Sequence, residues 1–162
     1  MNNLYRAHFF SSEVKRCGTF QNPYNFTERM PLTMPPQIHR IADEWFFSNF
    51  GQRFRSKAIF ATGNFVQAKE YLRPGSRLIN VWPIGSYRLC YSPSVYDLFE
   101  QFSTVFAGQS PSEKDLLQCL DQLGYICIQD GGLEEAAASK CEVMLQSDTF
   151  GYSFSKTVDR IL

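Results

Sequence analysis

Apolar residues along the chain follow two spacings, one typical of helices and the other typical of strands. Where they recur every three or four positions, we expect helices over residues 37–50, 65–72, 95–102, 113–123 and 133–139. Where they form short runs between Gly, Pro or Ser, we expect strands over residues 4–10, 58–62, 78–82, 86–91, 125–128, 141–145 and 150–155. Short strands mixed with short helices are typical of an α+β domain.

The segments between these elements give further expectations. Residues 11–18 are expected to form a short helix that ends at a glycine, and four prolines make residues 19–36 a long ordered loop. Residues 78–91 are expected to form a hairpin or a bent strand, and the aromatic alternation of 150–155 is typical of an edge strand. Because no repeat or linker interrupts the pattern, residues 1–162 are expected to form a single domain.

Composition limits the possible binding partners more than it limits the possible folds. With 15 Phe, 8 Tyr and 2 Trp, either the core is unusually bulky or some rings line a groove, and composition leaves both open. Sixteen basic and sixteen acidic side chains balance, so no strong field favours nucleic acid or anionic lipid. The only dense basic cluster comprises Arg53, Arg55 and Lys57.

Hydropathy and cysteine spacing indicate the compartment. No apolar run is long enough to span a bilayer, and the chain starts without an apolar signal segment, so we expect a cytoplasmic protein with no membrane partner. The five cysteines are scattered and never spaced as C-x-x-C, and only two histidines accompany them. This pattern predicts reduced thiols and no metal site.

Three segments far apart in the sequence carry the candidate chemistry: a strand with Arg6, a strand that ends in Thr62, and a strand with Glu142. Such a set suits cleavage of a glycosidic bond whose leaving group is positively charged. An arginine on a rigid strand holds phosphates, and a carboxylate stabilises the oxocarbenium ion that forms on the sugar. Glu142 is the strongest candidate, because an unpaired carboxylate is costly to bury in an apolar run.

The residues around these three positions form a recognisable series. The first segment is Leu4-Tyr5-Arg6-Ala7, followed by Ser12-Glu13-Val14-Lys15 and Gly18; the second is Ser56-Lys57-Ala58-Ile59-Phe60-Ala61-Thr62-Gly63-Asn64, followed by Ala68-Lys69-Glu70-Tyr71; the third is Cys141-Glu142-Val143. In this order they resemble the aromatic-Arg strand, the Ser-Thr-Ser strand and the catalytic-glutamate strand of mono-ADP-ribosyltransferases of the cholera and pertussis toxin class.

The resemblance implies an ADP-ribosyltransferase-like α+β fold, with two packed small, mainly antiparallel sheets around an NAD cleft and flanking helices. It implies NAD as co-substrate, with Arg6 holding its phosphates, Thr62 orienting the glutamate, and Glu142 stabilising the oxocarbenium ion. Phe65 or Tyr71 would stack on the nicotinamide ring. The full set expected to contact NAD is Arg6, Ala7, His8, Thr62, Asn64, Phe65 and Tyr71.

The acceptor is expected to meet the segment that leads into the glutamate strand, at Glu134, Glu135 and Lys140. Two departures from the family pattern matter. Ala61 and Gly63 replace the serines that flank the family's threonine. Lys140 stands where arginine-modifying members carry a second glutamate, and a cation cannot accept a proton from an arginine acceptor.

Other interpretations of these residues stay open. His8, Tyr71 and Glu142 would fill the roles of the histidine, tyrosine and glutamate of the diphtheria-type branch. Arg6 also fits a surface arginine that pairs with an acid, and threonine is commonplace where Thr62 ends a strand. Lys140 also fits a salt-bridge partner of Glu142.

Together these features predict an enzyme that moves ADP-ribose from NAD to a macromolecule in a host cytoplasm, as a phage protein or a delivered effector or toxin. A host protein is the favoured acceptor, and a nucleic-acid base is an alternative. An NAD glycohydrolase, and a binding or inhibitory module without catalysis, are the alternative functions.

Overall fold

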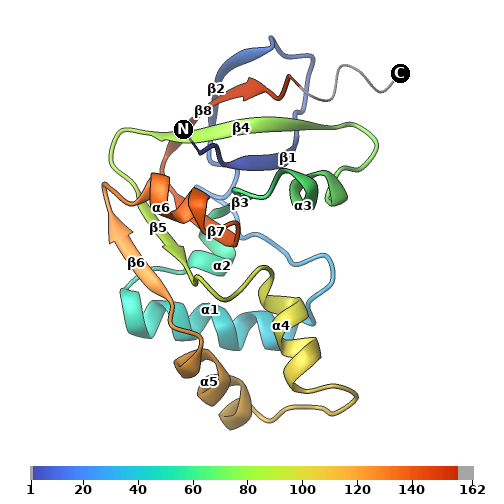
Figure 1. Cartoon of the computed structure of the whole chain (residues 1–162), viewed down its shortest axis with the longest axis vertical. Coiled ribbons are helices and arrows are strands. Elements are labelled where there is room, and N and C mark those ends of the chain that lie inside the picture. Colours follow the sequence, from blue (N-terminus) through green and yellow to red (C-terminus); the bar gives the residue numbers. More distant parts are fainter. Residues whose placement is uncertain (1, 157–162) are drawn as a thin grey trace.

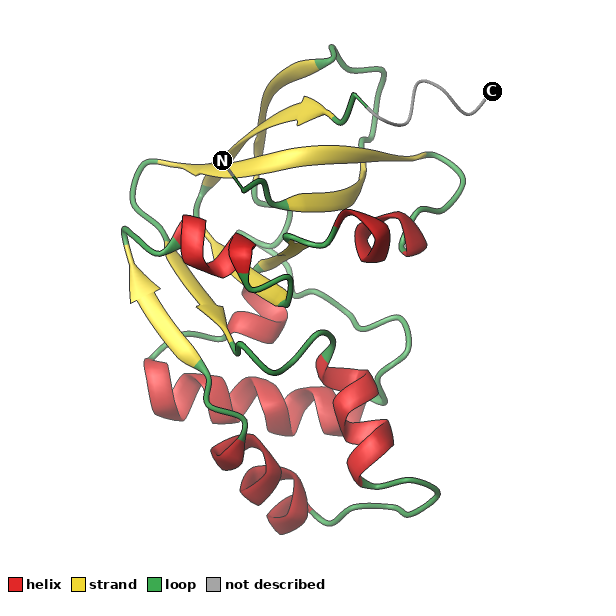
Figure 2. Cartoon of the chain, in the orientation of Figure 1, coloured by secondary structure: helices red, strands yellow, loops and turns green. Residues whose placement is uncertain are grey.

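The computed structural model of the chain describes residues 2–156, in which strands and helices alternate along the sequence (Figures 1 and 2). The strands are β1 (Tyr5–Phe9), β2 (Cys17–Gln21), β3 (Ile59–Thr62), β4 (Ser76–Ile84), β5 (Arg88–Tyr91), β6 (Ile126–Gln129), β7 (Glu142–Gln146) and β8 (Thr149–Phe154). The helices are α1 (Pro36–Phe50), α2 (Phe54–Lys57), α3 (Phe65–Glu70), α4 (Leu98–Val105), α5 (Glu113–Gln122) and α6 (Leu133–Ala138). The predicted α+β class is confirmed.

One open antiparallel sheet contains all eight strands, in the order β2-β8-β4-β1-β3-β7-β5-β6. The expectation of two packed sheets is therefore wrong. The sheet is nevertheless narrow at its centre, because β1 pairs with β3 only at Tyr5 and Thr62, whereas β1 pairs with β4 from Tyr5 to Phe9. A four-stranded half lies on either side of this junction, and Figure 1 shows the two halves diverging from it.

Two apolar clusters stabilise the two parts of the molecule. One cluster joins α1, α2, α4 and α5 to the sheet, and its largest fully buried members include Phe46, Phe54, Leu98, Leu116 and Met144. The other lies between the sheet and α6 and includes Ile59, Ile79, Leu89, Leu145 and Phe150. Many aromatic rings pack against each other inside these clusters, in edge-to-face pairs such as Phe46 with Tyr125. No helix in residues 2–156 is long and apolar enough to cross a membrane.

Three expectations about connections are wrong. The segment expected to be a helix over 11–18 ends in β2, which also takes the first residues of the expected 19–36 loop. β8 is an internal strand between β2 and β4, not an edge strand. β4 and β5 follow each other in sequence but are separate strands that pair with different neighbours, so residues 78–91 form neither a hairpin nor a single bent strand. Alternation of apolar residues shows which face is buried, but it does not show how many neighbours a strand has.

Gly63 allows α6 to pack against the end of β3. A Cβ atom on residue 63 would lie 1.7 Å from the carbonyl oxygen of Ala137, which belongs to the backbone of α6. Ala137 is itself fully buried, so the helix has no free space to retreat into. The close approach explains why residue 63 is a glycine.

We expect Gly63→Ala to lower the free energy of unfolding by about 3 kcal/mol or more, because the backbone of α6 must move. Chemical denaturation monitored by circular dichroism measures this change. Gly131→Ala is the matched control: its Cβ atom would meet no atom closer than 3.7 Å, so we expect a change within about 0.5 kcal/mol. Equal stability of the two variants would contradict the close packing of α6 on β3.

Candidate functional site

The sheet brings the three predicted segments onto adjacent strands. Tyr5 on β1 lies opposite Thr62 on β3, and Thr62 lies opposite Glu142 on β7. Directly opposed residues of antiparallel strands project from the same face of a sheet. Tyr5, Thr62 and Glu142 therefore form one row that crosses the narrow junction between the two halves of the sheet.

Glu142 is a nearly buried acid that forms an ion pair. Its side chain is 12% exposed, and its Oε1 atom lies 2.6 Å from Nη1 of Arg55, whose side chain is 5% exposed. Burial raises the pKa of Glu142 above that of an ordinary glutamate, and the charge of Arg55 opposes this rise. Arg55 reaches the acid from α2 and also lies 3.8 Å from the sulfur of Met144.

Thr62 uses its hydroxyl for the backbone. The hydroxyl donates to the carbonyl oxygen of Lys140 at 3.3 Å and accepts a hydrogen bond from the amide of Asn64 at 3.0 Å. In this geometry Arg55, not Thr62, orients the carboxylate of Glu142. Thr62 instead positions the residue from which the chain enters β7.

Lys140 is not the ion-pair partner of Glu142. Its backbone φ of 60° turns the chain just before β7, and its Nζ atom donates to the carbonyl oxygen of Gly63 at 3.0 Å. The interpretation of Lys140 as the salt-bridge partner of Glu142 is therefore wrong. The lysine is on the outside of a turn, and its ammonium group is held by the backbone.

Arg6 and His8, the two alternative candidates on β1, contact each other. Nε of Arg6 donates to Nδ1 of His8 at 3.2 Å, and Nη1 of Arg6 donates to the carbonyl oxygen of Phe60 at 2.9 Å. Burial lowers the pKa of His8 to about 3, and the positive charge of Arg6 acts in the same direction. His8 is therefore neutral at pH 7, with Nδ1 as an acceptor. Burial also lowers the pKa of Arg6, whereas Tyr24 raises it.

Arg29 and Arg55 are the two site residues that sequence reasoning missed. The guanidinium carbon of Arg29 lies 4.0 Å from the centre of the Phe60 ring, and that of Arg55 lies 4.4 Å from it. Arg55 was visible in the sequence only as part of a basic cluster that included Arg53. The sequence signal for a nearby arginine was the acid in the apolar strand, Glu142, because a buried carboxylate requires a cation nearby.

Three of the remaining predicted residues lie in or beside α3. Phe65 packs edge-to-face against Tyr5 at 5.3 Å, Asn64 caps α3 by accepting from the amide of Gln67, and Tyr71 donates to Asp97 at 2.7 Å. Phe65 and Tyr71 both lie outside the buried core.

The other predicted contacts occupy β1 and α6. Ala7 lies opposite Leu78 in the pairing of β1 with β4. Glu134 and Glu135 are exposed on α6, and Glu134 accepts a hydrogen bond from the backbone amide of Asn2 at 3.2 Å. Both acids are thus accessible to an acceptor.

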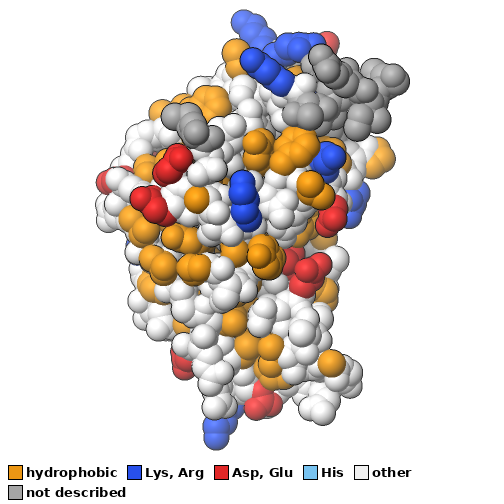
Figure 3. Space-filling view, in the orientation of Figure 1, with side chains coloured by type: hydrophobic (Ala, Val, Ile, Leu, Met, Phe, Trp, Pro, Cys, Tyr) orange, Lys and Arg blue, Asp and Glu red, His pale blue; other side chains and the backbone are white. Residues whose placement is uncertain are grey.

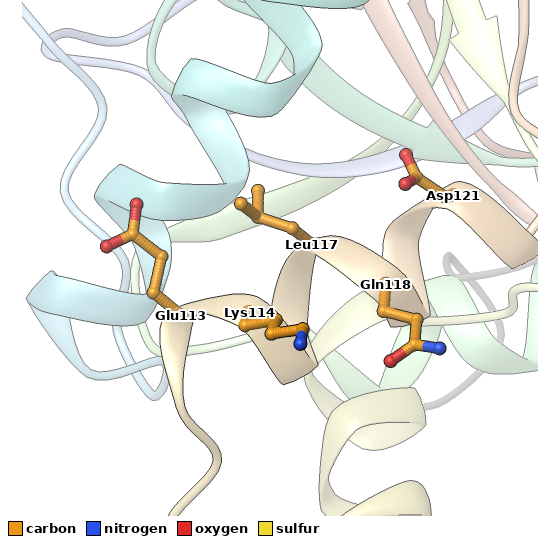
Figure 4. Close-up of a pocket in the computed structure, with 5 residues that line it drawn as sticks. All are labelled: Glu113, Lys114, Leu117, Gln118 and Asp121. Atoms are coloured by element: carbon orange, nitrogen blue, oxygen red, sulfur yellow. The ribbon is translucent and has the colours of Figure 1, made fainter.

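The surface adds little chemistry elsewhere. A shallow hollow of about 640 Å³ lies along α5, lined by Glu113, Lys114, Leu117, Gln118 and Asp121 (Figure 4). It includes none of the residues that meet at the row of Tyr5, Thr62 and Glu142. On the face shown in Figure 3, acidic and basic side chains are scattered among each other, without a basic stripe.

Within residues 2–156, no three His, Cys, Asp or Glu side chains lie close enough together to hold a metal ion. No protein-family model matches the chain, and neither a curated protein nor a solved structure matches it.

Burial of His8, and then the positive charge of Arg6, make stability depend on pH. Since the pKa of His8 is lowered from about 6.5 to about 3, its contribution is complete above pH 6.5 and is lost as the pH falls towards 3. Between pH 6.5 and 5 we expect the free energy of unfolding to fall by about 2 kcal/mol through His8. Urea denaturation at several pH values measures this slope.

His8→Gln should flatten that slope, because glutamine accepts the hydrogen bond from Arg6 but does not titrate. His39→Gln is the comparison: it removes the separate contribution of the other buried histidine and should leave the slope due to His8. A His8→Gln protein with the wild-type slope would show that His8 is not the group whose lowered pKa sets the slope.

Proposed function

We propose that the protein is an NAD-dependent mono-ADP-ribosyltransferase that modifies a macromolecule, with a host protein as the favoured acceptor and the host cytoplasm as its place of action. The observation that carries the proposal is the row of Tyr5, Thr62 and Glu142 across three adjacent strands. It supports the ordered resemblance of the three segments, because residues more than fifty positions apart in the sequence become neighbours.

Each residue has a defined task in the proposed reaction. The carboxylate of Glu142 lies beside the ribose and stabilises the positive charge that develops as nicotinamide leaves. The guanidinium of Arg6 binds a phosphate of NAD, and Phe65 or Tyr71 stacks on the nicotinamide ring. Thr62 supports the backbone at Lys140, so that β7 presents Glu142 at a fixed position.

Burial of Glu142 and its pairing with Arg55 both fit this task. A carboxylate in a region with little water stabilises a nearby cation more strongly than one in solvent. Burial alone would favour the protonated acid, and Arg55 favours the ionised form that the reaction needs. Arg55 is in this respect a positioning residue, because it acts on the reaction through Glu142.

The acceptor differs from that of the arginine-modifying enzymes. Lys140 replaces the acid that would accept a proton from an arginine, and its ammonium is bound to the carbonyl oxygen of Gly63. We propose that the exposed Glu134 and Glu135 contact the acceptor instead. Their charge favours a basic surface on the modified molecule.

One observation favours a second function, a binding or inhibitory module without catalysis. Oε1 of Glu142 already forms an ion pair with Arg55 at 2.6 Å. In addition, Ala61 and Gly63 replace both serines of the family's Ser-Thr-Ser pattern, so only the hydroxyl of Thr62 remains from it. A site of this kind could hold NAD without cleaving it. Release of nicotinamide separates the two functions.

The decisive assay measures free nicotinamide after incubation with NAD, with and without cell lysate. Release that depends on lysate is expected for a transferase, release in buffer alone identifies a glycohydrolase, and no release in either supports the binding module. Glu142→Gln should reduce turnover about a hundred- to a thousandfold, because the charge opposite the oxocarbenium ion is lost. The affinity for NAD should not weaken.

Glu113→Gln is the matched control, since it removes the same charge at an exposed position of α5, outside the row and outside the acceptor segment. It should leave the release of nicotinamide in the presence of lysate at the wild-type rate. Circular dichroism verifies that each variant is folded. Wild-type turnover by a folded Glu142→Gln protein would remove Glu142 from the mechanism and end the case for an enzyme.

A further inference from the structure

Three arginines from three different parts of the chain converge on Phe60. Arg29, from the segment between β2 and α1, and Arg55, from α2, both place their guanidinium groups over its ring. Arg6, from β1, donates to its carbonyl oxygen. We refer to Arg6, Arg29 and Arg55 as the arginine cluster.

Positive charge exceeds negative charge in the arginine cluster. Among the ion pairs of the described residues, Glu142 is the only carboxylate joined to any of the three arginines, and it pairs with Arg55. Arg6 is bonded to neutral acceptors, at His8 and Phe60. The pKa of Arg29 is lowered to about 10, by burial and then by repulsion from Arg55. Glu142 raises this pKa in turn, so the single carboxylate acts on both Arg29 and Arg55.

Two donors of the arginine cluster are buried without a hydrogen-bond partner among residues 2–156, Nη1 of Arg29 and Nε of Arg55. Buried donors in native proteins are nearly always satisfied, so two unsatisfied charged groups beside one aromatic ring indicate a ligand with several acceptor oxygens. Guanidinium groups match phosphate oxygens in geometry as well as in charge. The ring of Phe60 orients two of these groups in advance through cation–π contacts.

We infer that the arginine cluster is a binding site for a diphosphate group, and that Arg55 is shared between this anion and Glu142. The inference deepens the proposed function, on which it rests: the diphosphate is that of the dinucleotide, and Arg29 and Arg55 join Arg6 in holding it. When the diphosphate takes a hydrogen bond from Arg55, the ion pair loosens: one carboxylate oxygen of Glu142 faces the ribose, while the nearby guanidinium of Arg55 still favours the ionised acid. The Arg55–Glu142 ion pair is then the resting form of the site.

Calorimetric titration of the whole chain with sodium pyrophosphate, at constant ionic strength, tests the inference. Arg29→Gln should weaken pyrophosphate binding about tenfold or more, because a charged donor is lost. Glu142→Gln should strengthen it, because the competing carboxylate is gone. Arg73→Gln is the matched control: among the described contacts, the guanidinium of this exposed arginine bonds only to the carbonyl oxygens of Glu70 and Leu72, and its loss should leave binding unchanged.

Equal binding by wild type and Arg29→Gln, or an equal loss in Arg73→Gln, would overturn the site. Should Arg29→Gln fail to fold, Arg29→Lys keeps the charge but not the fork of donors, and it should still bind more weakly than wild type. ADP-ribose is expected to displace pyrophosphate. Displacement by a short single-stranded oligonucleotide but not by ADP-ribose would overturn the assignment to a dinucleotide.

The outcomes for the inference and for the proposed function are separable. Pyrophosphate binding that depends on Arg29, without any release of nicotinamide from NAD, would support the arginine cluster and contradict the enzyme. Cleavage of NAD by Arg29→Gln with unchanged KM and unchanged turnover would support the enzyme and contradict the arginine cluster.

Discussion

The ion pair between Arg55 and Glu142 is the interaction on which the arrangement of the site depends. It joins α2, which packs with α1 and its apolar cluster, to β7 in the sheet. Removing one partner of such a buried pair typically costs about 3–5 kcal/mol, because the other charge is left unpaired. The pair also determines the chemistry, since it favours an ionised carboxylate in a region where burial favours the protonated one.

The narrow junction of the sheet places this pair where two groups of strands diverge. Thr62 stands at the junction, opposite Tyr5 on one side and Glu142 on the other. Its hydroxyl holds the carbonyl oxygen of Lys140, and Gly63, the next residue, lets α6 approach. The backbone around the row is therefore fixed by a hydrogen bond and by close packing. The positive charge of the site comes from the side chains of the arginine cluster.

Sequence patterns predicted the features that depend on local periodicity or on the cost of burial. The apolar spacing of α1 and α5 was clear, and Glu142 stood out because an acid in an apolar strand needs a reason to be there. Arg55 was noted only as a member of a short basic cluster, because adjacency in sequence does not show which side chain of the cluster is buried. Arg53, two residues earlier, pairs at the surface with Glu44 instead.

Pairing and backbone geometry were equally hidden in the sequence. The alternation of β8 did not show that it has a neighbour on each side, and the left-handed backbone of Lys140 has no signal in its residue type, since glycine or asparagine is usual there. Arg29 lies in a proline-rich segment without periodicity, so only the folded chain brings it to Phe60.

The most direct measurement is a crystal structure of the protein with an NAD analogue whose glycosidic bond cannot be cleaved. The account predicts the diphosphate within hydrogen-bond distance of Arg6 and Arg29, and the nicotinamide ribose beside the carboxylate of Glu142. An analogue bound elsewhere, for example along the hollow of α5, with the Arg55–Glu142 pair unchanged, would contradict it.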